Sequence, residues 1–193
     1  MIIGITGGSG TGKTVVSSHF ENFGFLVIDS DEVAHKVMDK ESPCLNEVAE
    51  IFGYKYLNED KTLNRKKLGE KVFNDKTALE NLNKITHKYI TKEIEFLSKS
   101  STFVVIDAPL LIESGLDKIC DKTVFVSCPK DIRVQRIMLR DGISKEYALA
   151  RINAQKEDDF YRKNCDFEII NDGKNDISLK IEEILDCLKD LKN

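Results

Sequence analysis

Residues 7–14 read GGSGTGKT and match the pattern G-x-x-x-x-G-K-[ST]. An apolar segment at 2–6 predicts a strand before them, and residues 13–22 predict a helix after them. Glycines at this spacing let several backbone N–H groups point at one anion, and the helix adds the positive end of its dipole. Lys13 supplies a charge for the β- and γ-phosphates, and Thr14 supplies a hydroxyl for Mg²⁺. The alternative is a turn that merely connects strand to helix, but four glycines followed by Lys-Thr favour a nucleoside triphosphate site.

Four further apolar segments predict strands that alternate with helices, at 25–28, 102–106, 122–127 and 167–170. Continuously apolar strands are typical of a sheet that is covered on both faces. We therefore expect an α/β fold with a five-stranded parallel sheet sandwiched by helices. Helices are expected from Asp31 to about Lys40, near 44–52, 65–73, 76–99, 130–140 and 144–157, and from about 176. The last of them carries apolar residues on one face, namely Ile177, Ile181, Ile184, Leu185, Leu188 and Leu191.

The long helical stretch between the second and third strands breaks this alternation. We interpret it as an insertion at 33–100 that packs over one end of the sheet. No linker rich in Pro, Gly or Ser interrupts the chain, so residues 1–193 are expected to form a single domain. Its parts would be the insertion, a helical lid at 131–163, and a core made of 1–32, 101–130 and 164–193.

The composition excludes several classes of protein. The chain has 193 residues, of which 41% are hydrophobic and 32% charged, and this argues against disorder. A net charge of −4 is untypical of a nucleic-acid binder, and no apolar run approaches the roughly 18 residues of a membrane span. The five cysteines contain no C-x-x-C pair, so neither a zinc site nor a disulfide framework is expected. The first residues show no signal-peptide pattern, and we expect a cytoplasmic protein.

Three carboxylates follow predicted strands. Asp29 and Asp31 come at the carboxyl end of the second strand, the edge where ligands of open α/β sheets bind. A carboxylate there orients an acceptor hydroxyl and takes its proton in other kinases. The alternative for Asp31 is that it only caps the following helix. Asp107 ends the apolar strand before it, which resembles a Walker B pattern, and would hold magnesium directly or through water.

Arg133, Arg136 and Arg140 share one face of a predicted helix, because they are spaced by three and four residues. Residues 130–163 contain nine basic and six acidic side chains, a local net charge of +3. This pattern suits a lid that clamps phosphates. The alternative is an ordinary solvated charged face.

Phosphate binding alone leaves the class of enzyme open. The D-x-x-G and N-K-x-D motifs of GTPases are absent, and so is the signature loop of a transporter ATPase. An acceptor-side carboxylate, an arginine lid and a helical insertion favour a small-molecule kinase. Another small-molecule or nucleoside monophosphate kinase, and a nucleotide sensor without turnover, are the alternatives.

Several motifs outside the loop make the chain resemble the dephospho-coenzyme A kinase family over essentially its whole length. The loop matches T-G-G-x-G-x-G-K-[ST], and the chain has D-S-D where the family has D-A-D. The other matching segments are Phe52-Gly53, Leu63-Asn64-Arg65, Leu82 to Lys88, Pro109 to Glu113, Gln135-Arg136, Arg140, Arg151-Ile152, Ala154-Gln155 and Asn171. Two departures are Lys88, where the family usually has proline, and Asn64, where it has aspartate.

The resemblance implies transfer of the ATP γ-phosphoryl group to the 3′-hydroxyl of dephospho-coenzyme A, the final step of coenzyme A biosynthesis. Asp31 would be the general base, with Lys13 and Arg140 completing the catalytic set. ATP would be bound by Gly8, Gly10, Thr11, Gly12, Lys13, Thr14, Val15, Arg136, Arg140 and Asn171. The acceptor would be bound by Asp31, Arg65, His87, Pro109 and Leu110; for His87 the alternative is a hydrogen-bonded brace within the insertion. Mg²⁺ would be held by Thr14 and by Asp107, and no membrane, nucleic acid or obligate protein partner is expected.

Overall fold

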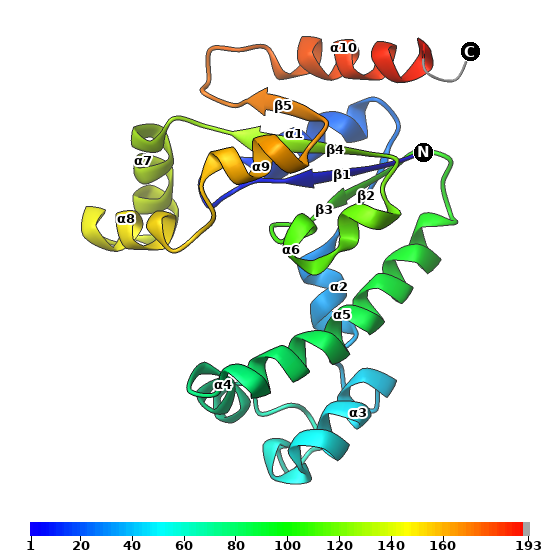
Figure 1. Cartoon of the computed structure of the whole chain (residues 1–193), viewed down its shortest axis with the longest axis vertical. Helices are drawn as coiled ribbons and strands as arrows, with labels where there is room; N and C mark the ends of the chain where they lie inside the picture. The colour runs from blue at the N-terminus through cyan, green and yellow to red at the C-terminus, as the bar shows by residue number, and fades with distance from the viewer. Residues whose placement is uncertain (191–193) are drawn as a thin grey trace. The chain divides into compact units, whose positions relative to one another are not determined.

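The computed structural model describes residues 1–190 and divides into two compact units (Figure 1). The first unit consists of residues 1–28 together with the chain from residue 101 onward, and it contains the sheet. The second unit is the helical segment 29–100. Each unit has a buried hydrophobic cluster of its own.

The sheet has five strands in the order β2-β3-β1-β4-β5. They are β1 (Ile2–Thr6), β2 (Leu26–Asp29), β3 (Val104–Asp107), β4 (Lys122–Ser127) and β5 (Phe167–Ile170). The pairings of β1 with β3, β1 with β4 and β4 with β5 are parallel. The predicted five-stranded parallel sheet is confirmed, with β2 and β3 each ending one residue later than expected. The loop at residues 7–14 leaves the middle strand at its carboxyl end, beside the ends of β3 and β4.

Helices cover both faces of this sheet (Figure 1). On one face, α1 (Lys13–Asn22) and α10 (Ile177–Asp190) bury apolar side chains against the alternate residues of β1, β3, β4 and β5. Of the apolar face expected on the last helix, Ile181, Ile184 and Leu188 are buried in this core, and Leu191 lies outside the described residues. The other face carries α6 (Leu111–Ser114), the 3₁₀ turn η2 (Leu116–Ile119) and α9 (Asp158–Asn164).

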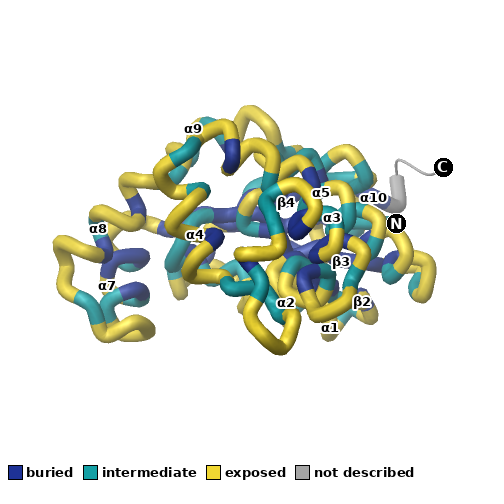
Figure 2. Tube along the Cα trace, turned by 90° about the horizontal axis from the view of Figure 1, so that it is seen from below, coloured by how far each residue is buried: buried dark blue, intermediate teal, exposed yellow. Residues whose placement is uncertain are grey.

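Two helices, α7 (Lys130–Asp141) and α8 (Lys145–Asn153), form a hairpin with a small core of its own. Its members are Val134, Ile137, Ala148 and Ile152. Figure 2 shows buried segments in dark blue on α7. The expected helix over 144–157 is wrong at its end, because α8 stops at Asn153 and a separate α9 begins at Asp158. With seven residues and one buried apolar residue, Tyr161, α9 has no periodic pattern that the sequence reveals.

The second unit contains α2 (Ser30–Lys36), α3 (Pro43–Phe52), η1 (Tyr54–Tyr56), α4 (Arg65–Phe73) and α5 (Lys76–Ser98). Polar side chains of Ser42, Asn64 and Asp75 accept backbone N–H groups at the starts of α3, α4 and α5. The unit's core is built from one face of α5 and the facing residues of α3 and α4, including Leu45, Leu68 and Ile85. The predicted end of α2 near Lys40 is wrong, because the helix ends at Lys36 and a turn follows.

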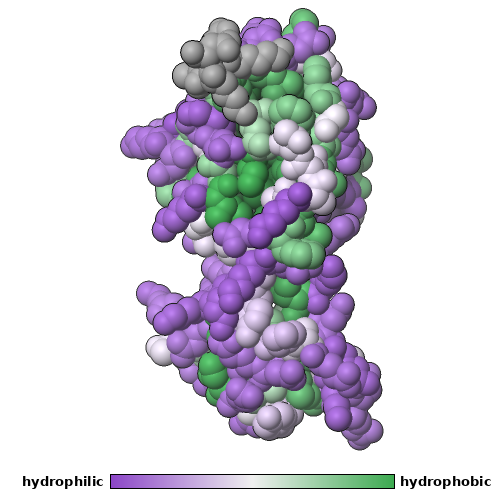
Figure 3. Space-filling view, turned by 90° about the vertical axis from the view of Figure 1, so that its right-hand side faces the viewer, coloured by the Kyte–Doolittle hydropathy of each residue, from purple (hydrophilic) through white to green (hydrophobic). Residues whose placement is uncertain are grey.

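Hydrophilic residues predominate on the surface seen in Figure 3, in keeping with the high proportion of charged residues. Within residues 1–190, none of the helices is both long enough and apolar enough to cross a membrane.

Candidate functional site

The loop at 7–14 needs glycine at two positions for backbone reasons. Gly10 and Gly12 have φ angles of 79° and 82°, in the left-handed region that residues with a Cβ seldom adopt. A Cβ atom on Gly12 would also lie 2.2 Å from Nδ2 of Asn171. The tight path of the loop is therefore set by its own glycines and by Asn171, which directly follows β5.

Two side chains bind the carbonyl groups on the outer side of the loop. The Asn171 amide donates to the carbonyl oxygens of Thr11 at 2.9 Å and Gly12 at 3.4 Å. Nη1 of Arg136 donates to the carbonyls of Gly10, Thr11 and Asn171 at 3.4, 3.3 and 3.1 Å. Both residues, expected to bind ATP, are thus placed directly against the loop by the structure.

Ser9, at the tip of the loop, is held at all three of its polar groups. Gln155 accepts from the Ser9 N–H at 2.9 Å and donates to its hydroxyl at 3.2 Å. Nε of Arg133 donates to the Ser9 carbonyl at 3.0 Å, and Nη2 of Arg133 donates to Gln155 at 3.1 Å. We call Arg133, Arg136, Gln155 and Asn171 the outer brace. Arg133 lies in the first turn of α7 and Gln155 follows the end of α8, so both ends of the α7–α8 hairpin are bound to the loop.

The inner side of the loop offers backbone donors. The N–H groups of Gly10, Gly12, Lys13 and Thr14 have no hydrogen-bond acceptor among residues 1–190. These four groups lie at and just before the N-terminus of α1, an arrangement that suits the binding of an anion. The carbonyls on the outer side of the loop are bound by protein donors, whereas the four inner N–H groups are not bound by any acceptor among the described residues. The inner side of the loop is therefore electropositive.

Lys13 and Asp107 form an ion pair in the interior of the first unit. Lys13 Nζ donates to Asp107 Oδ1 at 2.7 Å, and Ser17 Oγ donates to Oδ2 at 2.8 Å. The side chains of Lys13 and Asp107 are only 14% and 8% exposed. Ser17 was not expected from the sequence, although it lies one helical turn after Lys13 and so faces the same way.

The residues expected to hold Mg²⁺ fit that ion chemically. The Thr14 hydroxyl and the Asp107 carboxylate are oxygen donors, which Mg²⁺ prefers. Residues 1–190 contain no cluster of three or more His, Cys, Asp or Glu side chains suited to a metal ion. One or two protein oxygens are typical of Mg²⁺ sites in which phosphate oxygens and water complete the coordination.

The row of arginines on α7 divides into two parts. Arg133 is 6% exposed and Arg136 lies against the loop, so a solvated charged face is the wrong interpretation for these two. Arg140 is exposed at the end of α7 and binds Asp141 through two hydrogen bonds of 2.7 and 3.0 Å. Arg151 of α8 binds the same carboxylate, and hydrogen bonding to Arg140 holds the pKa of Asp141 below its usual value.

Asp29 and Asp31 have different local roles. One side-chain oxygen of Asp29 accepts from the backbone N–H of Asp31 at 2.7 Å and of Glu32 at 3.3 Å. Asp29 is therefore the N-cap of α2, and the interpretation of Asp31 as the cap is wrong. Asp31 itself lies in the first turn of α2.

The turn between β3 and α6 contains the expected acceptor residues of the first unit. The Thr6 hydroxyl donates to the carbonyl of Pro109 at 3.1 Å, and Leu110 is 57% exposed. Thr6 directly precedes the loop at 7–14, so this hydrogen bond links the turn between β3 and α6 to the loop at the end of β1.

The family model for dephospho-CoA kinase matches residues 1–176 of the chain. A dephospho-CoA kinase of Lactobacillus johnsonii is 34% identical over 189 residues, covering 95% of this chain and 96% of that protein. A dephospho-CoA kinase of Listeria innocua is 41% identical over 174 residues, covering 88% and 87%. The chain belongs to the dephospho-CoA kinase family.

Solved structures agree with this assignment. The structure of TT1252 from Thermus thermophilus has a TM-score of 0.80 at 30% identity, with 97% of each chain covered. The dephospho-CoA kinase from Campylobacter jejuni has a TM-score of 0.67 at 28% identity, covering 100% of this chain and 98% of that one. A shikimate kinase from Bacteroides thetaiotaomicron, at 16% identity and a TM-score of 0.56, shares the fold.

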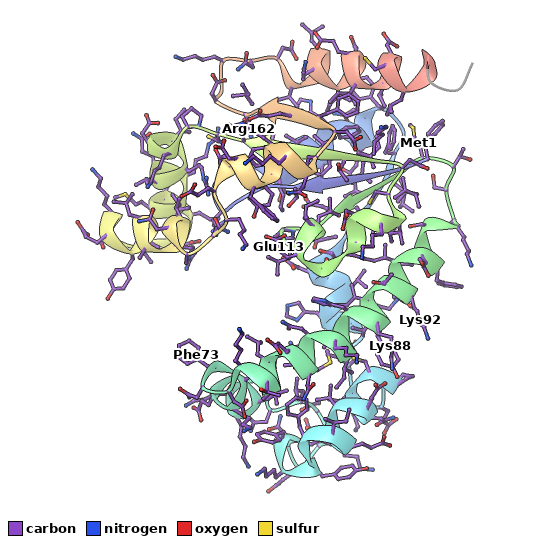
Figure 4. All side chains as sticks on the ribbon, viewed as in Figure 1. Met1, Phe73, Lys88, Lys92, Glu113 and Arg162 are labelled. Carbon is purple, nitrogen blue, oxygen red and sulfur yellow. The ribbon has the colours of Figure 1, made fainter. Side chains whose placement is uncertain are left out.

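Both departures from the dephospho-CoA kinase motifs have structural explanations. Asn64 accepts from the backbone N–H of Lys67 at 2.9 Å and caps α4, a role that asparagine and aspartate fill equally well. Lys88 binds Glu47 of α3, whose carboxylate also accepts from the Tyr89 hydroxyl at 2.7 Å. Figure 4 shows Lys88 projecting from α5 with Lys92 one turn further on. Lys88 thus joins α5 to α3.

His87 and Arg65, the other acceptor residues expected for a dephospho-CoA kinase, lie in the second unit. Arg65 is exposed at the start of α4, and His87 is half-buried on α5. No hydrogen bond joins the His87 ring to any of residues 1–190, so it is not a hydrogen-bonded brace.

Burial lowers the pKa of His87 from its ordinary value near 6.5. The unfolded chain therefore takes up a proton at a higher pH than the folded one, and protonation favours unfolding. Stability that is fully present above about pH 6.5 is lost as the pH falls below it. We expect His87→Asn to flatten the fall in unfolding free energy between about pH 7 and 5, measured by urea denaturation. Parallel pH profiles for the two proteins would contradict this.

Gly12→Ala is expected to weaken ATP binding by about tenfold or more, because the new Cβ displaces Asn171 from the loop. Gly24→Ala is the matched control. Gly24 has nearly the same φ angle, 83°, but no atom lies within 4 Å of the added Cβ. Both variants incur a backbone penalty of about 1–2 kcal/mol, and we expect only Gly12→Ala to lose ATP affinity in a calorimetric titration. Equal ATP affinity in both would contradict the role of the outer brace.

Proposed function

We propose that this protein is an ATP-dependent dephospho-CoA kinase, which phosphorylates the 3′-hydroxyl of dephospho-coenzyme A and releases coenzyme A and ADP. Membership of the family supports the reaction. The observation that carries it is the set of four N–H groups at and just before the start of α1 that have no acceptor among residues 1–190, on a helix whose first residue is Lys13. Such a loop binds a polyphosphate without a strongly basic surface, which is consistent with the net charge of −4.

The loop residues from Gly8 to Val15, with Arg136, Arg140 and Asn171, are proposed to bind ATP. Lys13 exchanges its bond to Asp107 for the β- and γ-phosphates, where it stabilises the charge of the transferring group. Arg136 and Asn171 act by holding the loop, since both donate to its carbonyls. Arg140 reaches the phosphates only after it gives up its bonds to Asp141.

Mg²⁺ is the proposed metal, with Thr14 and Asp107 as its protein ligands. It would neutralise charge on the β- and γ-phosphates. Loss of the Lys13 bond frees one oxygen of Asp107, while Ser17 keeps the other oxygen in place.

Asp31 is the proposed general base. It takes the proton of the 3′-hydroxyl as that oxygen forms a bond to the γ-phosphorus, and the bond from this phosphorus to the β-phosphate oxygen breaks to release ADP. Arg65, His87, Pro109 and Leu110 are proposed to bind the acceptor. We further propose that the protein acts in the cytoplasm on these two small molecules and needs no nucleic acid, membrane or protein partner.

The decisive experiment is an ADP-release assay with ATP, Mg²⁺ and a panel of acceptors. The panel contains dephospho-coenzyme A, coenzyme A, nucleosides and nucleoside monophosphates. We expect ADP release only with dephospho-coenzyme A, and a product that mass spectrometry identifies as coenzyme A. Release with a nucleoside or a monophosphate instead would indicate a different kinase. ATP binding without acceptor-dependent release would indicate a nucleotide sensor.

A further inference from the structure

The turn that precedes α6 has one local backbone hydrogen bond, from the Leu111 N–H to the Ala108 carbonyl at 3.3 Å. The helix that follows has four residues and no side-chain cap at its start, which is too short to be stable by itself. On one side the turn is held by β1, through the Thr6 hydroxyl and through Ala108 N–H, which donates to the Ile5 carbonyl at 2.9 Å. Its position on the other side depends on the contacts of α6.

Glu113 of α6 provides such a contact. Its Oε1 accepts from the hydroxyl of Tyr161 at 3.3 Å. In Figure 4, Glu113 lies below α9, the helix that carries Arg162 and Tyr161. Tyr161 is 3% exposed, and its ring stacks on Phe125 of β4 with the ring centres 5.0 Å apart. The ring is therefore anchored in the sheet, and its hydroxyl bonds to a carboxylate at the surface.

The first residue of α9 contacts the outer brace. Asp158, one turn before Tyr161, forms an ion pair with Arg133 at 3.4 Å, and Arg133 donates to the Ser9 carbonyl. One short helix thus bonds at its start to the residue that holds the nucleotide loop, and one turn later to the helix of the acceptor turn. Burial raises the pKa of Tyr161 to about 12, so its hydroxyl remains a proton donor at neutral pH.

We propose that Tyr161 is a positioning residue for the acceptor, which acts by bonding Glu113 and so fixing the turn at Pro109 and Leu110. This inference rests on the proposed function, because that function makes Pro109 and Leu110 acceptor-binding. A phenylalanine at position 161 would fill the same space over Phe125. The hydroxyl of Tyr161 adds the hydrogen bond to Glu113 of α6. The role is specific to the acceptor side, since Arg133 holds the loop through bonds that do not involve Tyr161.

Steady-state kinetics of Tyr161→Phe test the inference. Phenylalanine keeps the ring stacked on Phe125 and removes only the hydroxyl. We expect the KM for dephospho-coenzyme A to rise about threefold to tenfold, while the KM for ATP and kcat stay within about twofold. Tyr147→Phe, at a 72% exposed position on α8, is the matched control and should change nothing.

Glu113 variants test whether the hydroxyl acts through this carboxylate. Glu113→Gln keeps an acceptor oxygen and should stay close to the wild type, whereas Glu113→Ala should raise the acceptor KM. Adding Tyr161→Phe to Glu113→Ala should then have no further effect. An unchanged acceptor KM in Tyr161→Phe, an equal rise in both KM values, or additive effects in the double variant would overturn the inference. A wild-type protein without dephospho-coenzyme A-dependent ADP release would instead overturn the proposed function.

Discussion

Asp31→Asn is expected to lower kcat by about 10²–10⁴-fold while ATP affinity stays unchanged. Asparagine has the size of aspartate but cannot accept the proton of the acceptor hydroxyl. It also leaves the backbone of α2 unaltered, because the cap of that helix is Asp29. Turnover is measured as coenzyme A formation at saturating substrates, and ATP affinity by calorimetric titration.

The neighbouring aspartate provides the control. Asp29→Asn retains a side-chain oxygen that accepts the N–H groups of Asp31 and Glu32, and asparagine caps helices as well as aspartate does. We expect this variant to keep nearly full activity. A kcat near the wild-type value in Asp31→Asn would remove Asp31 from the role of base, and a large loss in Asp29→Asn would transfer that role to Asp29.

Lys13→Ala is expected to abolish measurable phosphoryl transfer and also to destabilise the first unit. The rate falls by at least about 10²-fold because the charge on the transferring phosphoryl group loses its cation. Stability falls by about 3 kcal/mol because Asp107 stays buried without its cationic partner, although Ser17 still donates to it. Activity is followed by ADP release and stability by urea denaturation.

A double variant separates the two effects. Lys13→Ala with Asp107→Asn removes the unpaired charge, since the amide that replaces it still accepts from Ser17. We expect most of the lost stability to return and the activity to remain absent. Full activity in Lys13→Ala would overturn the role of the loop in catalysis. Equal stability of the wild type and Lys13→Ala would show that the buried pair adds nothing to folding.

Local sequence patterns predicted the sheet and most helices because each strand has an apolar segment at its centre or along most of its length and each long helix has an apolar face. The motif at 7–14 predicted the loop for a similar reason, since glycine at 10 and 12 is required by left-handed backbone angles. Spacing predicted that Arg133 and Arg136 share a face of α7, but not what that face contacts. Their acceptors are carbonyls near the N-terminus, and no local pattern encodes such a contact.

The features that the sequence did not reveal depend on a few polar contacts. α9 has one buried residue and hence no period, although its Asp158 and Tyr161 bond to Arg133 and Glu113. The choice between Asp29 and Asp31 as the cap of α2 rests on where the helix begins, which is at Ser30 and not at Asp31. An error of one residue at the helix start was enough to assign the cap to the wrong carboxylate.

We expect the outer brace to determine when the protein acquires its affinity for nucleotide during synthesis. Ser9 and Thr11 leave the ribosome early, but the side chains that hold them follow 124 to 160 residues later along the chain. Contacts over such separations form late in folding, because a long segment of chain must be ordered before they can close. A nascent chain that ends before Asn171 contains the entire glycine-rich motif and lacks one of the side chains that hold it. We therefore expect ATP binding to report on the folding of the C-terminal part of the chain.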